Sequence, residues 1–269
     1  MIQVASAAAT HVGRVRPTNE DSYLTLPDLV LVADGMGGHA CGDVASALTV
    51  TAFEPLGTRS CLHADDVTEA VDRANQAIVS EALAHPEKAG MGTTVTGVAV
   101  VDEAGAPHWL VFNIGDSRVY RIEGGVARQL TVDHSEVAEL VAAGRITPDD
   151  ARVHPLRNVI TRSLGMSPPP VADTWLVPVE PGDLFLVCSD GLTNELDDAE
   201  IAELVTRSGD IEAAAAALVE AALAAGGHDN VTVILASTAD DRPADTDSLS
   251  ETDTLTLPRK NLDASDVPA

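Results

Sequence analysis

Short apolar runs recur along this chain and predict β-strands, because they are rich in valine, isoleucine and leucine and are bounded by glycine, aspartate or proline. They fall at residues 29–33, 93–101, 109–114, 118–122, 184–188 and 231–236. Several follow one another through short turns such as "GDS" and "EGG". Strands joined by short turns pair antiparallel, so the pattern favours antiparallel sheets with helices packed outside over a doubly wound parallel sheet.

Helical periodicity appears between the strands. In residues 65–83 one face carries the apolar positions Val67, Val71, Ala74 and Ile78. Asp66 followed by Glu69 has the pattern of a capping box at the start of this helix. A second helix is predicted near residues 196–205, where Asp197 and Glu200 repeat that pattern.

An alanine-rich stretch at residues 210–227 is a strong helix former that stops at Gly226 and Gly227. From about residue 237 the composition changes to Asp, Ser, Thr and Pro, without an apolar period. The sequence therefore predicts one folded domain over residues 1–236 and a disordered acidic tail over residues 237–269.

Composition narrows the class of protein. The chain has 269 residues, 45% apolar and 3% aromatic, so its core is expected to be aliphatic. We find no apolar run long enough to span a bilayer and no signal peptide. Three widely spaced cysteines, Cys41, Cys61 and Cys188, argue against a disulfide framework or a CxxC zinc site, and they predict a cytoplasmic protein.

The formal net charge of −26 makes nucleic acid or an anionic membrane surface an improbable partner, since both would repel the chain. Acidity of this kind is usually a solubility feature. Whether some carboxylates instead hold cations has to be decided site by site.

One acid in particular raises that question. Asp34 follows the apolar run at residues 29–33, and Gly35, Gly37 and Gly38 come next. An Asp-Gly pair is a common turn, and that is the simplest interpretation. The alternative is a site where a carboxylate and bare backbone approach something small and charged.

Other acids lie at strand ends in the same way. They are Asp116 after the run at 109–114, Asp190 after the run at 184–188, Asp229 before the run at 231–236, and the pair Glu20 and Asp21 near the N-terminus. If these strands are neighbours, the carboxylates converge and repel one another unless cations lie between them. Oxygen ligands without a Cys or His cluster suit Mg²⁺, Mn²⁺ or Ca²⁺.

Two such ions sharing a carboxylate can lower the pKa of a water and bind phosphoryl oxygens, which predicts phosphate chemistry. A cationic side chain is then needed for the remaining phosphate oxygens. Arg16, five residues before Asp21, offers a planar fork for this contact, and Arg14 is its structural competitor.

Eight segments in register carry a family resemblance: "RPTNEDS", "VADGMGGHACGDVAS", "MGTTVT", "NIGDSRVYR", "LTVDHSEVAELVAAGRIT", "HPLRNVITRSLG", "CSDGLTNEL" and "GGHDNVTV". Together they resemble the bacterial branch of the PPM family of metal-dependent Ser/Thr protein phosphatases (protein phosphatase 2C), over roughly residues 3–236. The resemblance implies an α+β fold, a four-layer αββα sandwich with two central antiparallel β-sheets flanked by helices and a flap subdomain at about residues 131–165.

The resemblance also assigns roles to residues. Asp34 would bridge two Mn²⁺ or Mg²⁺ ions, and Gly35 would offer its carbonyl to one of them. Asp190 and Asp229 would ligate the other, and Glu20 and Asp21 would act through metal-bound waters. Asp116 with Asp190 matches a possible third metal position. Arg16 matches the phosphate-binding arginine.

Three features of the resemblance are less direct. His39 is a candidate general acid or a hydrogen-bonding neighbour of the site. Cys41 departs from the small residue common at its position, and it is either a buried filler or a redox-sensitive thiol. The flap would help decide which substrates dock; within it Thr147 and Pro148 form a good helix start, and His134 and His154 are interpreted as structural.

The predicted function is a protein serine/threonine phosphatase in which a hydroxide held between the two ions attacks phosphoserine or phosphothreonine directly. No CxxxxxR phosphate loop follows Cys188, which argues against a cysteine-dependent phosphatase. Its expected partners are phosphorylated proteins, a Ser/Thr kinase and that kinase's substrates, and the enzyme is expected to be a monomer.

Two alternatives stay open at this stage. One is a non-catalytic domain that binds phosphoproteins, and the other is an enzyme acting on small phosphate esters. In the tail, Thr252, Thr254 and Thr256 are candidate phosphorylation sites.

Overall fold

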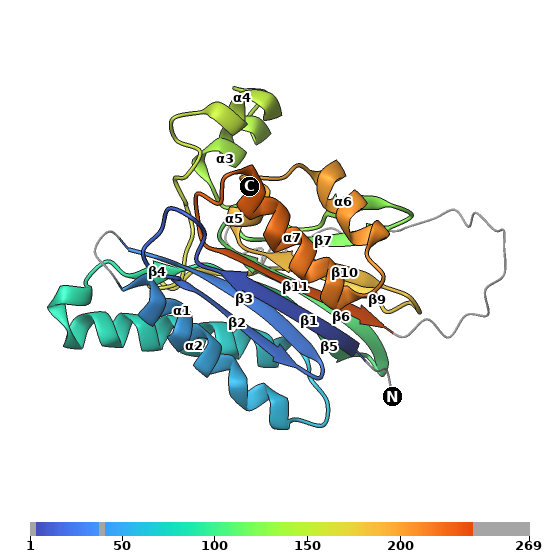
Figure 1. Cartoon of the computed structure of the whole chain (residues 1–269). Helices are drawn as coiled ribbons and strands as arrows, with labels where there is room; N and C mark the ends of the chain where they lie inside the picture. The colour runs from blue at the N-terminus through green and yellow to red at the C-terminus, as the bar shows by residue number, and fades with distance from the viewer. Residues whose placement is uncertain (1–3, 38–40, 239–269) are drawn as a thin grey trace, which may run out of the picture.

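Two antiparallel sheets lie face to face at the centre of the protein, and helices cover their outer faces (Figure 1). The computed structural model describes residues 4–37 and 41–238. The first sheet has the spatial order β1 (Val4–His11), β11 (Val231–Thr238), β10 (Leu184–Cys188), β7 (Arg118–Glu123) and β8 (Val126–Gln129).

The second sheet runs β2 (Asp21–Leu26), β3 (Leu29–Met36), β5 (Val95–Glu103), β6 (Ala106–Ile114) and β9 (Asp173–Pro178), with the short β4 (Gly92–Thr93) beside β3. Helices α1 (Gly42–Phe53) and α2 (Ala64–Ala84) pack on this sheet, and α6 (Asp198–Arg207) and α7 (Ile211–Ala225) pack on the first. The predicted four-layer α+β architecture is confirmed.

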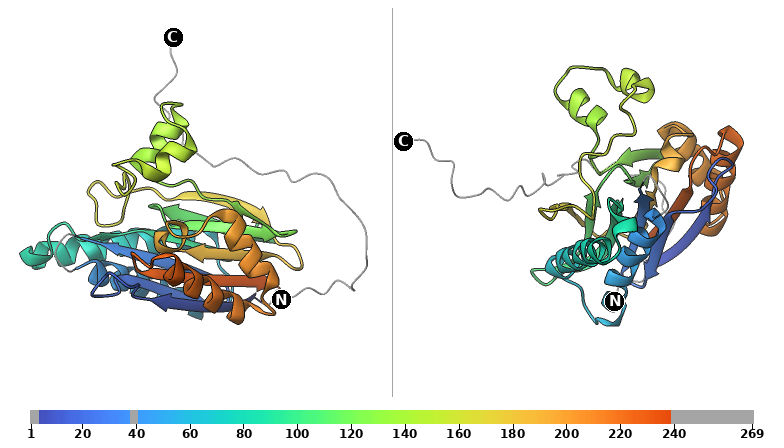
Figure 2. Two further views of the ribbon diagram at one scale, coloured as in Figure 1. Left: turned by 45° about the horizontal axis from the view of Figure 1, so that its top comes forward. Right: turned by 90° about the vertical axis from the view of Figure 1, so that its left-hand side faces the viewer.

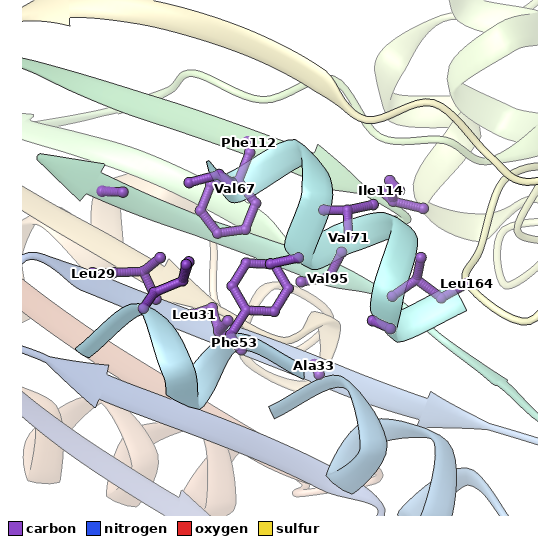
Figure 3. Packing of buried hydrophobic residues seen from close by; sticks show 14 of the residues in the cluster. Leu29, Leu31, Ala33, Phe53, Val67, Val71, Val95, Phe112, Ile114 and Leu164 are labelled. Atoms are coloured by element: carbon purple, nitrogen blue, oxygen red, sulfur yellow. The ribbon is translucent and has the colours of Figure 1, made fainter. Parts of the chain in front are cut away.

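The side-chain alternation of β3 shows how the sequence specifies these layers. Leu29, Leu31 and Ala33 point to the helical layer, where α1 and α2 contribute apolar side chains (Figure 3). Val30 and Val32 point the other way, into the core between the sheets. A strand buried on both faces reads as a continuous apolar run, and full burial of each such side chain contributes about 1.5–3 kcal/mol.

Aromatic residues are few, and two pairs of them anchor different layers. Phe53 of α1 stacks on Phe112 of β6, with ring centroids 5.8 Å apart. Between the sheets, Trp109 and Phe185 meet with centroids 4.9 Å apart. The remaining volume is filled by aliphatic side chains, as the composition predicts.

Helix starts follow the predicted signals with one correction. Asp197 caps α6 and Thr147 caps α4 (Pro148–Val153), and the following Pro148 is the first helical residue. In α2, however, the N-cap is His63, and Asp66 is the third helical residue whose carboxylate accepts the His63 backbone N–H at 2.9 Å. The prediction of Asp66 as the cap was wrong because a carboxylate at either position satisfies an end N–H group.

Several elements carry no strong sequence signal. The edge strand β1 is mostly alanine, β2 alternates polar and apolar residues, and β9 and α1 were not predicted either. Five strands also extend beyond their predicted runs, namely β3, β5, β6, β7 and β11. β3 continues through Asp34 and Gly35 to Met36, and β11 includes Ser237 and Thr238, which the sequence assigned to the tail. The rest of the predicted tail, with its candidate threonines, lies outside the described residues.

Helices α3 (Glu136–Ala142) and α4 project beyond the sandwich at one end (Figures 1 and 2). They belong to the segment 131–165, here called the flap. Its base is tied to the second sheet, because Thr93 and Leu164 exchange backbone hydrogen bonds of 3.2 and 2.9 Å. The backbone N–H of His134 donates to the carbonyl of Gly115 at 2.9 Å.

Candidate metal and phosphate site

Two of the predicted acids are direct neighbours across a strand pair. Asp21 opens β2 and lies opposite Asp34 in the register of β3. Asp34 and Gly35 are therefore part of a strand, and the turn predicted from this Asp-Gly pair is wrong. The backbone of Asp34 is held from the other side, because Thr94 accepts the Asp34 N–H at 3.0 Å and Thr93 donates to the Asp34 carbonyl at 2.8 Å.

The first sheet brings two more acids to the same end of the sandwich. Asp190 follows β10, and Asp229 lies two residues before β11, which pairs with β10. The carboxyl groups of Asp34 and Asp190 are close enough to shift each other's pKa, so the two sheets meet here through their acids. Asp116 lies in the connection from β6 to β7, which passes from one sheet to the other.

Crowding of these carboxyl groups shifts their ionisation. Burial, together with the charges of Asp21 and Asp190, raises the pKa of Asp34 well above its usual range. Burial raises the pKa of Asp21 to about 7, although hydroxyl groups of Thr232 and Ser189 oppose the rise. The pKa of Asp190 is also raised, chiefly by burial and then by the charge of Asp229.

Asp116 belongs to the same electrostatic group. Its side chain is buried, and burial with the charges of Asp190 and Asp133 raises its pKa to about 8. Glu20 also has a raised pKa, from burial and from Asp43, while Arg16 lowers it. Burial and neighbouring negative charges favour the protonated form of these acids. A cation among them would lower their pKa values and favour the ionised form.

The donor atoms present fit a hard divalent cation. One oxygen of Asp21 and one of Asp116 are buried and have no hydrogen-bond partner, although buried polar atoms are nearly always paired. The surrounding functional groups are carboxylates, hydroxyls and backbone carbonyls, which suit Mg²⁺ or Mn²⁺.

Within residues 4–37 and 41–238, no three carboxylate, imidazole or thiol side chains are already grouped closely enough to hold a metal ion. Several of the oxygens are instead turned to protein partners. Asp21 accepts from Ser189 at 2.8 Å and Thr232 at 2.6 Å, and Asp229 pairs with Arg16 at 2.7 Å. Rotation of these side chains is what the site needs to close around an ion.

Gly35 has a steric reason to be glycine that the sequence analysis missed. A Cβ atom there would lie 2.2 Å from the carbonyl oxygen of Gly42 and 2.5 Å from that of Glu20. The backbone of β3 therefore runs against the start of α1 at this point. Gly37 has no such close contact, and Gly38 lies outside the described residues.

Arg16 lies at the rim of the acidic group. Its side chain is about half exposed and donates to Asp229, and that hydrogen bond raises the pKa of the guanidinium. Arg14 instead donates to the Leu223 carbonyl at 2.8 Å, at the end of α7. Arg14 therefore has the structural role, while Arg16 is the arginine next to the acids.

Asn230 organises the N-terminal part of the site, and sequence reasoning did not select it. Its side-chain oxygen accepts the Glu20 N–H at 2.8 Å, and its amide donates to the carbonyls of Val12 and Thr18 at 2.9 Å. Ser189 and Thr232 were missed as well. All three lie inside the motifs that carry the family resemblance, beside Asp190 and Asp229, so adjacency to a predicted ligand was the available signal.

The cysteines and histidines differ in what they contact. Cys188 is fully buried, and burial raises its pKa to about 12, so it is a poor nucleophile. Cys41 is half-buried, caps α1 and packs against the core below the second sheet. His134 is held between the Gly115 N–H at 3.0 Å and Asp173 at 3.1 Å, and His154 accepts the Leu156 N–H. His39 lies outside the described residues.

In the described part of the chain, no helix combines the length and apolarity that membrane crossing requires. The fold and the site together define an α+β sandwich protein with a cluster of carboxylates at one end of its paired sheets.

Comparison with known proteins identifies the family. The sequence profile described as Protein phosphatase 2C matches residues 18–225, and the chain belongs to this family. It is 36% identical over 237 residues to the serine/threonine phosphatase stp of Listeria innocua, covering 84% of this chain and 92% of that protein. The serine/threonine protein phosphatase PstP of Mycobacterium tuberculosis is 39% identical over 245 residues; the match covers 87% of this chain and 45% of PstP.

A solved structure shows the same fold. The catalytic domain of PstP in complex with two manganese ions superposes with a TM-score of 0.79 at 35% sequence identity, covering 89% of this chain and all of that one.

Proposed function

We propose that this chain is a metal-dependent protein serine/threonine phosphatase that hydrolyses phosphoserine and phosphothreonine with the help of Mn²⁺ or Mg²⁺. The observation that carries the proposal is the gathering of Asp21, Asp34, Asp116, Asp190 and Asp229 at one end of the sandwich, where burial and neighbouring charges raise the pKa values of Asp21, Asp34, Asp116 and Asp190. Family membership and the activity named for the relatives support it.

Asp34 is the proposed bridging ligand of two ions. Its pKa is raised by the charges of all four others, so it interacts with each member of the group. Gly35 would add its backbone carbonyl. When bound, such ions polarise phosphoryl oxygens and lower the pKa of coordinated water.

The remaining acids take the outer positions. Asp190 and Asp229, from the first sheet, would hold the second ion, and Asp116 with Asp190 would hold a third. Glu20 and Asp21 would bind through water, since Asp21 already gives one oxygen to Ser189 and Thr232.

Arg16 is the proposed phosphate-binding residue. Its guanidinium is exposed on one side and bonded to Asp229 on the other, so it can contact a phosphoryl group bound at the acids. A planar guanidinium donates two parallel bonds to phosphate oxygens, which fixes the orientation of the group as well as neutralising it.

The proposed reaction is direct hydrolysis without a covalent phosphoenzyme. Cys188, two residues before Asp190, is buried and has a pKa raised to about 12. A role for His39 as the general acid stays a prediction. So do the opposing Ser/Thr kinase, the monomeric state and the cytoplasmic location.

The test is hydrolysis of p-nitrophenyl phosphate and of a phosphothreonine peptide by the full chain, with Mn²⁺ and with EDTA. We expect Mn²⁺-dependent turnover of both substrates and loss of turnover in EDTA. Asp34→Asn should abolish turnover of both while the circular dichroism spectrum is unchanged. Turnover that persists in EDTA, or in Asp34→Asn, would overturn the proposed site.

A further inference from the structure

A cavity of about 630 Å³ lies between the flap and the first sheet. Asp116 and Asp190 line it, so it is continuous with the group of acids that the proposed function places at the phosphate. Helix α5 (Asp190–Thr193) and the start of α6 form part of its wall, and the flap helices α3 and α4 form another. A volume of this size takes a ligand much larger than one phosphoryl group.

The two flap helices turn defined faces to this cavity. From α3 come Val137, Ala138, Val141 and Ala142, at the spacing of one helical face. From α4 come Pro148, Ala151 and Arg152, again one face. The lining residues of these two helices are thus apolar except for Arg152, and Arg157, which follows α4, adds a second arginine to the cavity.

Neither arginine is paired with a residue that the structure describes. Among the described residues, the side chains of Arg152 and Arg157 make no hydrogen bond or ion pair, and both residues are exposed. The chain has 16 basic and 42 acidic residues, so two arginines without an acidic partner on one wall of a cavity are unusual. The acids Asp149 and Asp150 of α4 do not line the cavity, and Asp150 is engaged with Thr147.

The acids that do line the cavity each have a partner or a proposed role elsewhere. Asp133 forms an ion pair with Arg118 at 2.6 Å, and Asp198 accepts a hydrogen bond from Tyr120 at 3.1 Å. Asp116 and Asp190 belong to the proposed metal site. The charge that stays available to a ligand at the flap wall is therefore positive.

We propose that this cavity binds the polypeptide segment next to the phosphorylated residue, and that Arg152 selects an acidic side chain, Asp or Glu, in that segment. The inference rests on the proposed function and adds the class of phosphoprotein substrate. An arginine fork pairs with a carboxylate through two parallel bonds, while the apolar face of α3 contacts the neighbouring side chains.

Arg152 lies outside the motifs that carry the family resemblance. The two flap motifs that resemble the family cover residues 130–147 and 154–165, and Arg152 lies in the gap between them. Arg157 lies inside the second motif.

The test is a set of phosphothreonine peptides of one length, with Asp, Asn or Lys placed at each flanking position in turn. The full chain is assayed with Mn²⁺, and the readout is the kcat/KM of each Asp peptide divided by that of its Asn partner. At one or more positions we expect Asp to raise kcat/KM about three- to tenfold, mainly through KM, with the gain shrinking as salt is added.

Variants then test whether Arg152 causes the gain in kcat/KM of the Asp peptides. Arg152→Ala should bring the Asp-to-Asn ratio to about one, and Arg152→Glu should invert it so that Lys peptides are preferred. Arg145→Ala is the matched control, because Arg145 is an exposed flap arginine that does not line the cavity, and it should keep the wild-type ratio. Each ratio is taken on an enzyme that turns over the Asn peptide, so misfolding does not mimic the effect.

The proposal is overturned if no flanking Asp raises kcat/KM, if the gain survives in Arg152→Ala, or if Arg145→Ala loses it equally. Absence of Mn²⁺-dependent turnover of p-nitrophenyl phosphate would instead overturn the proposed function, so the two failures are distinguishable.

Discussion

An aspartate flanks strand β10 on each side, the buried Asp183 before it and the partly buried Asp190 after it, and the two have different surroundings. Asp183 precedes the strand and has protein partners on both carboxylate oxygens. One oxygen accepts from Trp109 at 3.0 Å and from the Glu180 N–H at 2.7 Å, and the other accepts from Arg121 at 2.9 Å. Burial still raises the pKa of Asp183, but Arg121 and the hydrogen bonds oppose it.

At the other end, Asp190 faces acids. Asp34 and Asp229 lie beside it, and Asn194 donates one hydrogen bond of 3.0 Å. Nearby Asp116 has a buried oxygen with no partner. Aspartate therefore completes a set of hydrogen bonds within the protein at one end of the strand. At the other end, carboxylate oxygens lack protein partners and are available to a ligand. A buried acid indicates a ligand site when its partners within the protein are missing or are also acids.

The largest expected effect separates the two ends by activity. Asp190→Asn should lower Mn²⁺-dependent kcat/KM by about a thousandfold or more, because it removes a proposed metal ligand. Asp183→Asn should keep activity within about threefold of wild type. Steady-state kinetics on both variants checks this, and equal losses would mean that the two ends are not functionally distinct.

Substitutions should affect stability in the opposite order: loss of the structural Asp183 should destabilise the protein, and loss of an acid from the crowded group should stabilise it. Asp183→Ala leaves Arg121 and the Trp109 indole without their buried partner, so the free energy of unfolding should fall by about 2–4 kcal/mol. Asp116→Asn relieves charge crowding, and in EDTA it should raise the free energy of unfolding by about 1 kcal/mol. Urea denaturation in EDTA measures both, and a destabilised Asp116→Asn would contradict the comparison.

The pH dependence of the metal-free protein follows from the raised pKa values of Asp21, about 7, and Asp116, about 8. An unfolded aspartate loses its proton near pH 4, so between pH 4 and 8 the folded state binds more protons than the unfolded state. For these two groups stability is therefore highest below pH 4. It declines as pH rises to about 8, by up to about 1.4 kcal/mol per pH unit for each group.

Thermal unfolding in EDTA at pH 5 and pH 8 checks this sign, with the lower Tm expected at pH 8. Added Mn²⁺ should raise Tm more at pH 8 than at pH 5, because protons and cations compete for the same carboxylates. A Tm in EDTA that rises with pH over this range would show that these acids are already ionised without a metal.

The smallest expected effect comes from Thr232→Val. The buried Thr232 hydroxyl donates to Asp21 at 2.6 Å, which lowers the pKa of that acid, and valine has a similar shape. Its loss should raise the Mn²⁺ concentration needed for half-maximal activity about two- to fivefold at pH 6.5 and less at pH 8.5. A Mn²⁺ titration at both pH values tests it, with Thr206→Val, a remote hydroxyl on α6, as the control that should change neither value.

Much of the architecture follows from local pattern. Apolar runs located β3, β5, β6, β7, β10 and β11 because strands buried on both faces need them. Helix caps located α4 and α6, since an N-terminal carboxylate or hydroxyl satisfies end N–H groups nearby in sequence. The edge strands β1 and β2 escaped prediction, because a strand with few apolar side chains is defined by its pairing partner.

The site also has a part that local sequence predicts and a part that depends on the fold. The residue types at strand ends, and their motifs, were enough to nominate Asp34, Asp190 and Asp229 and the class of ion they suit, because ligand chemistry belongs to the side chain itself. Which acids become neighbours depended on two sheets meeting, as when Asp21 aligns with Asp34 and Asp190 reaches Asp34 from the other sheet. The roles of Asn230, Ser189 and Thr232 became visible in the fold, since a hydrogen bond between residues some two hundred positions apart has no trace in local sequence.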